Sequence, residues 1–324
     1  MTARSYLLAI ATSTLLFLNP PRAMAGGNIC GSDQVFPPAS QATGSNSFQN
    51  PACLPGGHLA YTVWIYGYNG NQNPDAERAD IYSLNPANLS EPPVFIGSRN
   101  PPINRRVNNV GHIAVGNKIA YACYSNNICV SDLKGGSLVV SDFPGGEGGF
   151  EEPVFDSSGT YVAFEWTKSE SSDGESGKAD ICVVPANSLK GRKCANLDGL
   201  NAQPDWSPAS GSPWVVFQRK DSKGWNLYKI PVQSGVPQKA QMKQITKNGN
   251  STDASWTPDG KKIVYSCDGK ICLLDPESGS SSRVATRGGQ YFGAVSMCGD
   301  GYIYYETGVG DDKTPTAICR TKAP

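Results

Sequence analysis

Hydrophobic positions in this chain come in short runs separated by turns, and one stretch shows the pattern completely. Between Ser255 and Asp275 the sequence reads SWTPDGKKIVYSCDGKICLLD. Pro258-Asp259-Gly260 and Asp268-Gly269 supply turn chemistry, because proline fixes φ and glycine accepts a positive φ. The β-branched and aromatic residues that follow each turn favour strands. We therefore expect a meander of antiparallel strands here.

The second strand of this unit recurs along the chain at intervals of about 40 to 60 residues. Each copy has an aliphatic residue, then a small or aliphatic one, then an aromatic one: Leu59-Ala60-Tyr61, Ile119-Ala120-Tyr121, Val162-Ala163-Phe164, Val215-Val216-Phe217, Ile263-Val264-Tyr265 and Ile303-Tyr304-Tyr305. A turn precedes each copy, and a third and a weaker fourth strand follow. Six repeats of four short strands predict an all-β, six-bladed β-propeller. A β-sandwich would not explain the repetition.

Polar residues occupy one repeated position of the predicted innermost strands. The residue that closes this strand in the fifth repeat is Trp256, and the sequence aligns it with Cys53, His112, Phe155, Trp206 and Met297. Three residues earlier, the first five repeats carry Asn50, Asn109, Glu152, Gln203 and Asp253. We expect these five to form a ring at one mouth of the central channel. Such a ring either holds water or binds a ligand or partner.

The repeat resembles that of the TolB-like propellers, whose pattern runs Pro-x-Trp-Ser-Pro-Asp-Gly. The stretches that carry the resemblance are Trp256 to Tyr265, Pro204-Asp205-Trp206-Ser207-Pro208 and, more weakly, Pro153 to Gly159. The resemblance implies one propeller domain over residues 26–324, without the domain that precedes the propeller in TolB. We expect blades at residues 50–106, 107–149, 150–200, 201–250, 251–288 and 289–324, with 28–36 as the last strand of blade six.

In the family pattern the third strand carries tyrosine, as at Tyr82 and Tyr228, but four repeats have cysteine there. Each of these cysteines needs a partner one strand away. The alignment then implies Cys123–Cys129, Cys182–Cys194, Cys267–Cys272 and Cys30–Cys319, which leaves Cys53–Cys298. The sequential alternative pairs Cys30 with Cys53 and Cys298 with Cys319.

The first 25 residues are expected to be a secretory signal peptide. Arg4 precedes an uncharged run from Leu7 to Leu18, and Ala23-Met24-Ala25 is a small-x-small cleavage site. The run is too short to span a bilayer core of about 30 Å. Export to an oxidising compartment also fits ten cysteines, an even number. We therefore predict a periplasmic or secreted protein without membrane insertion.

Charge and motifs exclude several classes of function. The 28 basic and 28 acidic residues balance, so no basic surface for nucleic acid is expected. There is no Gly-x-Ser-x-Gly motif, and two histidines cannot build a histidine metal cluster. We predict no catalytic residues, no metal and no cofactor.

The sequence therefore predicts a monomeric, non-catalytic propeller that binds a protein partner in the cell envelope or outside the cell. A loop-rich face, with loops at residues 67–78 and 167–178, would carry the contact. Two alternatives remain open: a glycan or small-ligand binder that uses the polar ring, and a hydrolase or lyase with carboxylate chemistry at the same mouth.

Overall fold

The computed structural model describes residues 30–36, 46–65, 78–97, 110–123, 127–132, 138–141, 143, 148–169, 177–208, 213–287, 291–308 and 317–324. The expected signal peptide, residues 1–25, lies outside this part of the chain.

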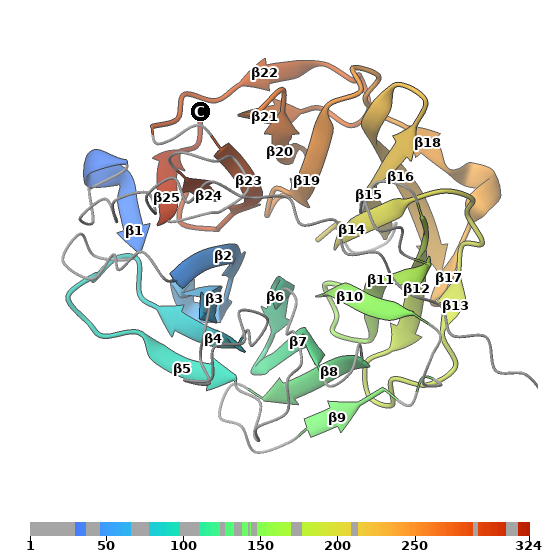
Figure 1. Ribbon diagram of the computed structural model, residues 1–324, viewed down its shortest axis with the longest axis horizontal. Coiled ribbons are helices and arrows are strands. Elements are labelled where there is room, and N and C mark those ends of the chain that lie inside the picture. Colours follow the sequence, from blue (N-terminus) through green and yellow to red (C-terminus); the bar gives the residue numbers. More distant parts are fainter. Residues whose placement is uncertain are drawn as a thin grey trace, which may run out of the picture.

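The described chain forms six antiparallel sheets arranged around a central axis, which confirms the six-bladed β-propeller (Figure 1). The innermost strands line the centre of the ring: β2 (Asn46–Cys53), β6 (Val110–Val115), β10 (Gly149–Phe155), β14 (Asn201–Trp206), β19 (Ser251–Trp256) and β23 (Tyr291–Met297). The second strands follow: β3 (Leu59–Ile65), β7 (Lys118–Cys123), β11 (Tyr161–Ser169), β15 (Trp214–Asp221), β20 (Ile263–Cys267) and β24 (Tyr302–Gly308).

Third and fourth strands complete each blade toward the rim. The third strands are β4 (Arg78–Leu84), β8 (Asn127–Asp132), β12 (Lys178–Pro185), β16 (Gly224–Gln233), β21 (Lys270–Leu274) and β25 (Ala317–Lys322). The outer strands are β5 (Val94–Gly97), β9 (Leu138–Val140), β13 (Lys193–Cys194), β17 (Val236–Pro237) with β18 (Lys243–Gln244), β22 (Ser281–Arg283) and β1 (Gln34–Phe36). Three short 3-10 helices lie outside the sheets: η1 (Gly31–Asp33), η2 (Pro55–Gly57) and η3 (Lys239–Gln241).

Three successive residues of each second strand are buried, although side chains of a strand alternate between its two faces. In β20, Ile263, Val264 and Tyr265 are 0%, 0% and 3% exposed. Both faces are covered because each blade packs against a neighbouring blade on either side. This double burial explains the run of aliphatic and aromatic residues that marks every repeat in the sequence.

The N-terminal strand closes the ring, as predicted. Strand β1 pairs antiparallel with β25, and Gln34 lies opposite Cys319. Blade six is therefore built from both ends of the chain, with the order β1-β25-β24-β23. The innermost strands β2 and β23 are in contact, which joins blade one to blade six.

All ten cysteines are in disulfides, and the pairs are those implied by the repeat alignment, not the sequential alternative. Four bonds lie within single blades: Cys123–Cys129, Cys182–Cys194, Cys267–Cys272 and Cys30–Cys319, the last of which ties the N-terminal segment to β25 of blade six. The fifth bond, Cys53–Cys298, fastens blade one to blade six. Five disulfides fit a protein of an oxidising compartment.

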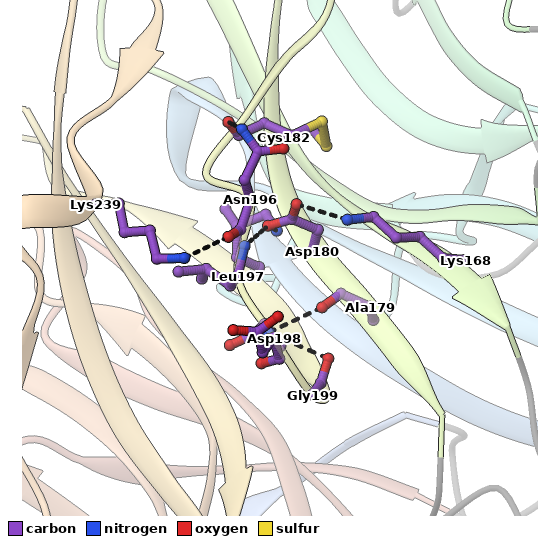
Figure 2. A network of polar contacts seen from close by, with 12 residues as sticks. Lys168, Ala179, Asp180, Cys182, Asn196, Leu197, Asp198, Gly199 and Lys239 are labelled. Atoms are coloured by element: carbon purple, nitrogen blue, oxygen red, sulfur yellow. Dashed lines mark hydrogen bonds and ion pairs between the residues drawn. A yellow bond between two sulfur atoms is a disulfide. The ribbon is translucent and has the colours of Figure 1, made fainter.

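A network of polar contacts lies within blade three, and one exposed contact links it to blade four (Figure 2). Asp180 of β12 is fully buried, and its carboxylate accepts hydrogen bonds from the backbone N–H of Leu197 at 3.2 Å and from Lys168 Nζ at 2.9 Å. Lys239 of η3, in blade four, donates to the carbonyl oxygen of Asn196 at 2.6 Å. The buried charge is thus paired and hydrogen-bonded, as a stable interior requires.

Candidate functional site

Each innermost strand contains a β-bulge at the position of the predicted polar ring. In blades one, three, four and five the register with the second strand shifts around Asn50, Glu152, Gln203 and Asp253. These four residues have φ between 50° and 53°, in the left-handed region. Asparagine and aspartate tolerate this region, whereas glutamate and glutamine rarely adopt it. A bulge re-aims the side chain it carries, and it recurs here at equivalent positions.

The alignment of blade two with the other blades needs a correction. Strand β6 pairs Ala114 with Ile119, as β19 pairs Trp256 with Ile263, so Ala114 and not His112 holds the Trp256 position. The hairpin of blade two is shorter than those of its neighbours, because Val115 already pairs with Lys118. Counting back three residues from Ala114 gives Gly111. Asn109, the predicted ring member, lies outside the described residues.

The structure brings the other four predicted ring residues together. Asn50, Glu152, Gln203 and Asp253 line one cavity of about 20 Å³, and each is partly exposed. Blade six contributes Ala294, whose φ is 35°. A cavity of roughly 10–15 Å³ holds one water molecule, so this one admits a single small group.

Side chains of the second strands fix the bulges by hydrogen bonds across the joints between blades. Glu306 Oε2 accepts a hydrogen bond from the backbone N–H of Asn50 at 3.1 Å, in the next blade. In the same way Glu165 Oε2 binds the N–H of Gln203 at 3.3 Å, and Gln218 Oε1 binds that of Asp253 at 3.0 Å.

These three acceptors occupy one repeated position, directly after the aromatic residue of the second strand. The sequence interpretation missed their role. The signal was present as an acidic or amide residue at that position in three of the six repeats, which carry Glu165, Gln218 and Glu306.

Carboxylates dominate the electrostatics of this mouth. Burial raises the pKa of Glu152 well above its ordinary value, and the neighbouring carboxylates of Glu165, Glu151, Asp253 and Glu306 raise this pKa further. Gln203 Oε1 is buried and accepts no hydrogen bond from the described residues. A buried acceptor without a donor costs about 1–3 kcal/mol. The mouth therefore offers negative charge and at least one unused acceptor.

A second concave feature lies at the joint of blades six and one, on the rim. A cavity of about 180 Å³ is lined by Val35 and Phe36 of β1, by Leu84, and by residues 89–93 before β5. Val94 and Phe95 beside it are 61% and 47% exposed. The lining combines aliphatic, aromatic and proline residues with the polar Ser90 and Glu91.

Other predicted features fall wholly or partly outside the described chain. Most of the two predicted loops, 67–78 and 167–178, is not described, because residues 66–77 and 170–176 lie outside the described chain. Within the described residues, no group of three or more His, Cys, Asp or Glu side chains could hold a metal ion. None of the described helices has the length and apolar character needed to cross a membrane.

The ring of six blades, closed by the N-terminal strand, defines a six-bladed β-propeller. TolB from Acinetobacter baumannii superposes with a TM-score of 0.57 at 18% identity, over 82% of this chain and 64% of that one. No family profile and no curated protein matches the sequence.

Two enzymes share the same fold. A puromycin hydrolase matches with a TM-score of 0.54 at 16% identity, over 80% of this chain and 43% of that one. An oligogalacturonate lyase in complex with manganese matches with a TM-score of 0.57 at 14% identity, over 88% and 76%. The chain thus spans less than two thirds of the length of the hydrolase and of TolB. At these identities the likeness establishes the fold, and the fold alone does not choose a function.

Proposed function

We propose that this protein is an exported, non-catalytic propeller that recognises a protein partner at the mouth of its central channel. One observation carries the proposal: four polar side chains from four different blades converge on one small, partly exposed cavity. All four lie at β-bulges of the innermost strands, and such bulges are over-represented beside active sites.

The size of the cavity favours a protein over a free glycan or metabolite. A volume of about 20 Å³ receives one water-sized group, so it cannot enclose a sugar ring. A partner protein needs to place only the tip of one side chain or one chain end there. The surrounding face then supplies the contact area that a stable complex requires.

Affinity capture from cell-envelope extract tests this function. The bait is the mature, oxidised protein, compared with the double variant Glu152→Gln/Asp253→Asn. The control variant Asp198→Asn/Asp268→Asn removes the same charge from two exposed residues. Both control residues lie at the same end of the blades but outside the cavity, since Asp268 follows the strand end that pairs with Ser251. We expect a partner that the wild type and the control retain and the double variant loses. Failure to capture any partner, or equal capture by all three, would contradict the proposal.

A second candidate rests on Glu152. A carboxyl group with a raised pKa beside the carboxylate Asp253 suits a general acid, and one structural neighbour is an oligogalacturonate lyase. Cleavage of uronate-containing oligosaccharides by the wild type, and loss of cleavage in Glu152→Gln, would favour this enzyme over a binding protein.

A further inference from the structure

The groups at the channel mouth select the chemistry of what enters. Glu152 and Asp253 contribute carboxylates, and Gln203 contributes a buried amide oxygen that lacks a donor among the described residues. The backbone N–H groups of Gln203 and Asp253 are already bonded to Glu165 and Gln218. The mouth therefore presents mainly acceptors to an incoming group. A group with several donors and a positive charge fits this arrangement.

The volume of the cavity narrows the choice of cationic group further. A guanidinium is planar and broad, whereas an ammonium is a compact point charge with three donors. Calcium takes six to eight oxygen ligands, which the four lining side chains match only if all six of their oxygen atoms coordinate the ion at once. A cavity of about 20 Å³ suits the compact ammonium.

We propose that the channel mouth binds a primary ammonium group, with Glu152 and Asp253 supplying the charge and Gln203 Oε1 accepting one of the N–H donors. The biological source of the ammonium group rests on the proposed function, because that source is a lysine side chain or a free N-terminus of the protein partner. The binding chemistry itself can be tested on the isolated protein.

The first test is an NMR titration of the ¹⁵N-labelled mature protein with ethylammonium chloride, followed through the side-chain amide signal of Gln203. Tetraethylammonium chloride is the matched control, because it has the same charge but no N–H donor and too large a volume. We expect saturable shifts with ethylammonium alone. The variant Glu152→Gln should weaken binding by about tenfold or more, as expected when a carboxylate beside a cation is neutralised. Its backbone is compatible with glutamine, since Gln203 holds the same φ of 50°.

The affinity of the cavity for ethylammonium should also rise with pH over the range in which Glu152 loses its proton. The groups that face Glu152 and share its titration are Glu151 on β10, Glu165 on β11, Asp253 on β19 and Glu306 on β24. Equal shifts with both ammonium salts, or saturation by calcium chloride without any response to ethylammonium, would overturn the inference.

The second test finds the source of the ammonium by treating the captured partner. Acetylation neutralises all of its amines, whereas guanidination with O-methylisourea alters lysine and spares the α-amine. Loss of capture after acetylation alone identifies the N-terminus, and loss after both treatments identifies lysine. A partner that still depends on the mouth residues but binds equally after acetylation would overturn the ammonium inference and leave the proposed function standing.

Discussion

Two of the five disulfides hold the ring closed, and removing them tests a quantitative prediction. Cys30–Cys319 ties residues 289 positions apart, and Cys53–Cys298 ties residues 245 positions apart. Cys30–Cys319 ties the N-terminal segment to β25 within blade six, and Cys53–Cys298 joins blade one to blade six. The two bonds lie near both ends of the same stretch of chain, so each shortens the loop that the other closes. The two stabilising effects should therefore be coupled.

The chain-entropy relation gives the size of each effect. Alone, the outer and inner bonds would each stabilise by about 5.5 kcal/mol. When one bond is present, the other closes a loop of only about 44 residues, made of 30–53 and 298–319, and adds about 4 kcal/mol. Removing either pair should cost about 4 kcal/mol, and removing both should cost about 9.5 kcal/mol. The double loss thus exceeds the two single losses by about 1.5 kcal/mol.

Equilibrium unfolding in urea, followed by tryptophan fluorescence, measures these differences. Each pair is changed to alanine, alone and together. Cys123→Ala/Cys129→Ala is the control, because it also removes two buried sulfurs but opens a loop of separation 6, worth about 2 kcal/mol.

Two results would refute the reasoning. One is a loss, on removing either of these two pairs, no larger than that of the control. The other is strict additivity of the two pairs. Since domains of this kind are stable by about 5–15 kcal/mol, a double variant that is already unfolded without urea agrees with the prediction.

Three further variants test the inner ring. Glu152→Gln should stabilise the protein at neutral pH and have no effect near pH 4. The reason is that the folded state, in which the pKa of Glu152 is raised, loses stability relative to the unfolded state as pH rises above the ordinary pKa of 4.5. Thermal melting of both proteins from pH 4 to 8 checks this, and a difference in melting temperature that does not change with pH would contradict it. Asp205→Ala removes the acceptor 2.6 Å from the backbone N–H of Trp256 and should cost about 2–3 kcal/mol in urea unfolding, whereas a loss under 0.5 kcal/mol would show that the contact is replaceable. Gln203→Val should cost about 1–3 kcal/mol because a β-branched residue is strained at φ 50°, whereas Gln203→Gly should be nearly neutral; equal melting temperatures of the two variants would refute the strain.

The fold could be predicted because its information is local and repeated. The aliphatic-small-aromatic strand and its turn are set by residues such as Ile263 to Tyr265 and Pro258 to Gly260, and six copies reinforce one another. Ring closure could be predicted because the sixth repeat lacks a fourth strand of its own, and Cys319 has no partner in that repeat except Cys30.

The site was harder to predict because it depends on register and on contacts between blades. The sequence aligned His112 with Trp256, two residues before the true equivalent, and only the pairing of Ala114 with Ile119 reveals the tighter hairpin of blade two. The carboxylates of Glu165 and Glu306 accept hydrogen bonds from backbone N–H groups of the next blade. Nothing in the local sequence around either glutamate specifies which N–H donates to it. The raised pKa of Glu152 depends on the same convergence.

The pairing of β1 with β25 sets a limit on when the protein can finish folding. During synthesis the strand at 34–36 emerges long before its partner at 317–322. Blades one to five need only near neighbours in sequence, whereas blade six must wait for delivery of the whole chain. Until β25 arrives, β1 has no partner strand and the edge of β24 is open, and open edges invite pairing with other chains. The newly made protein is therefore most vulnerable to aggregation in the interval just before β25 inserts between β1 and β24.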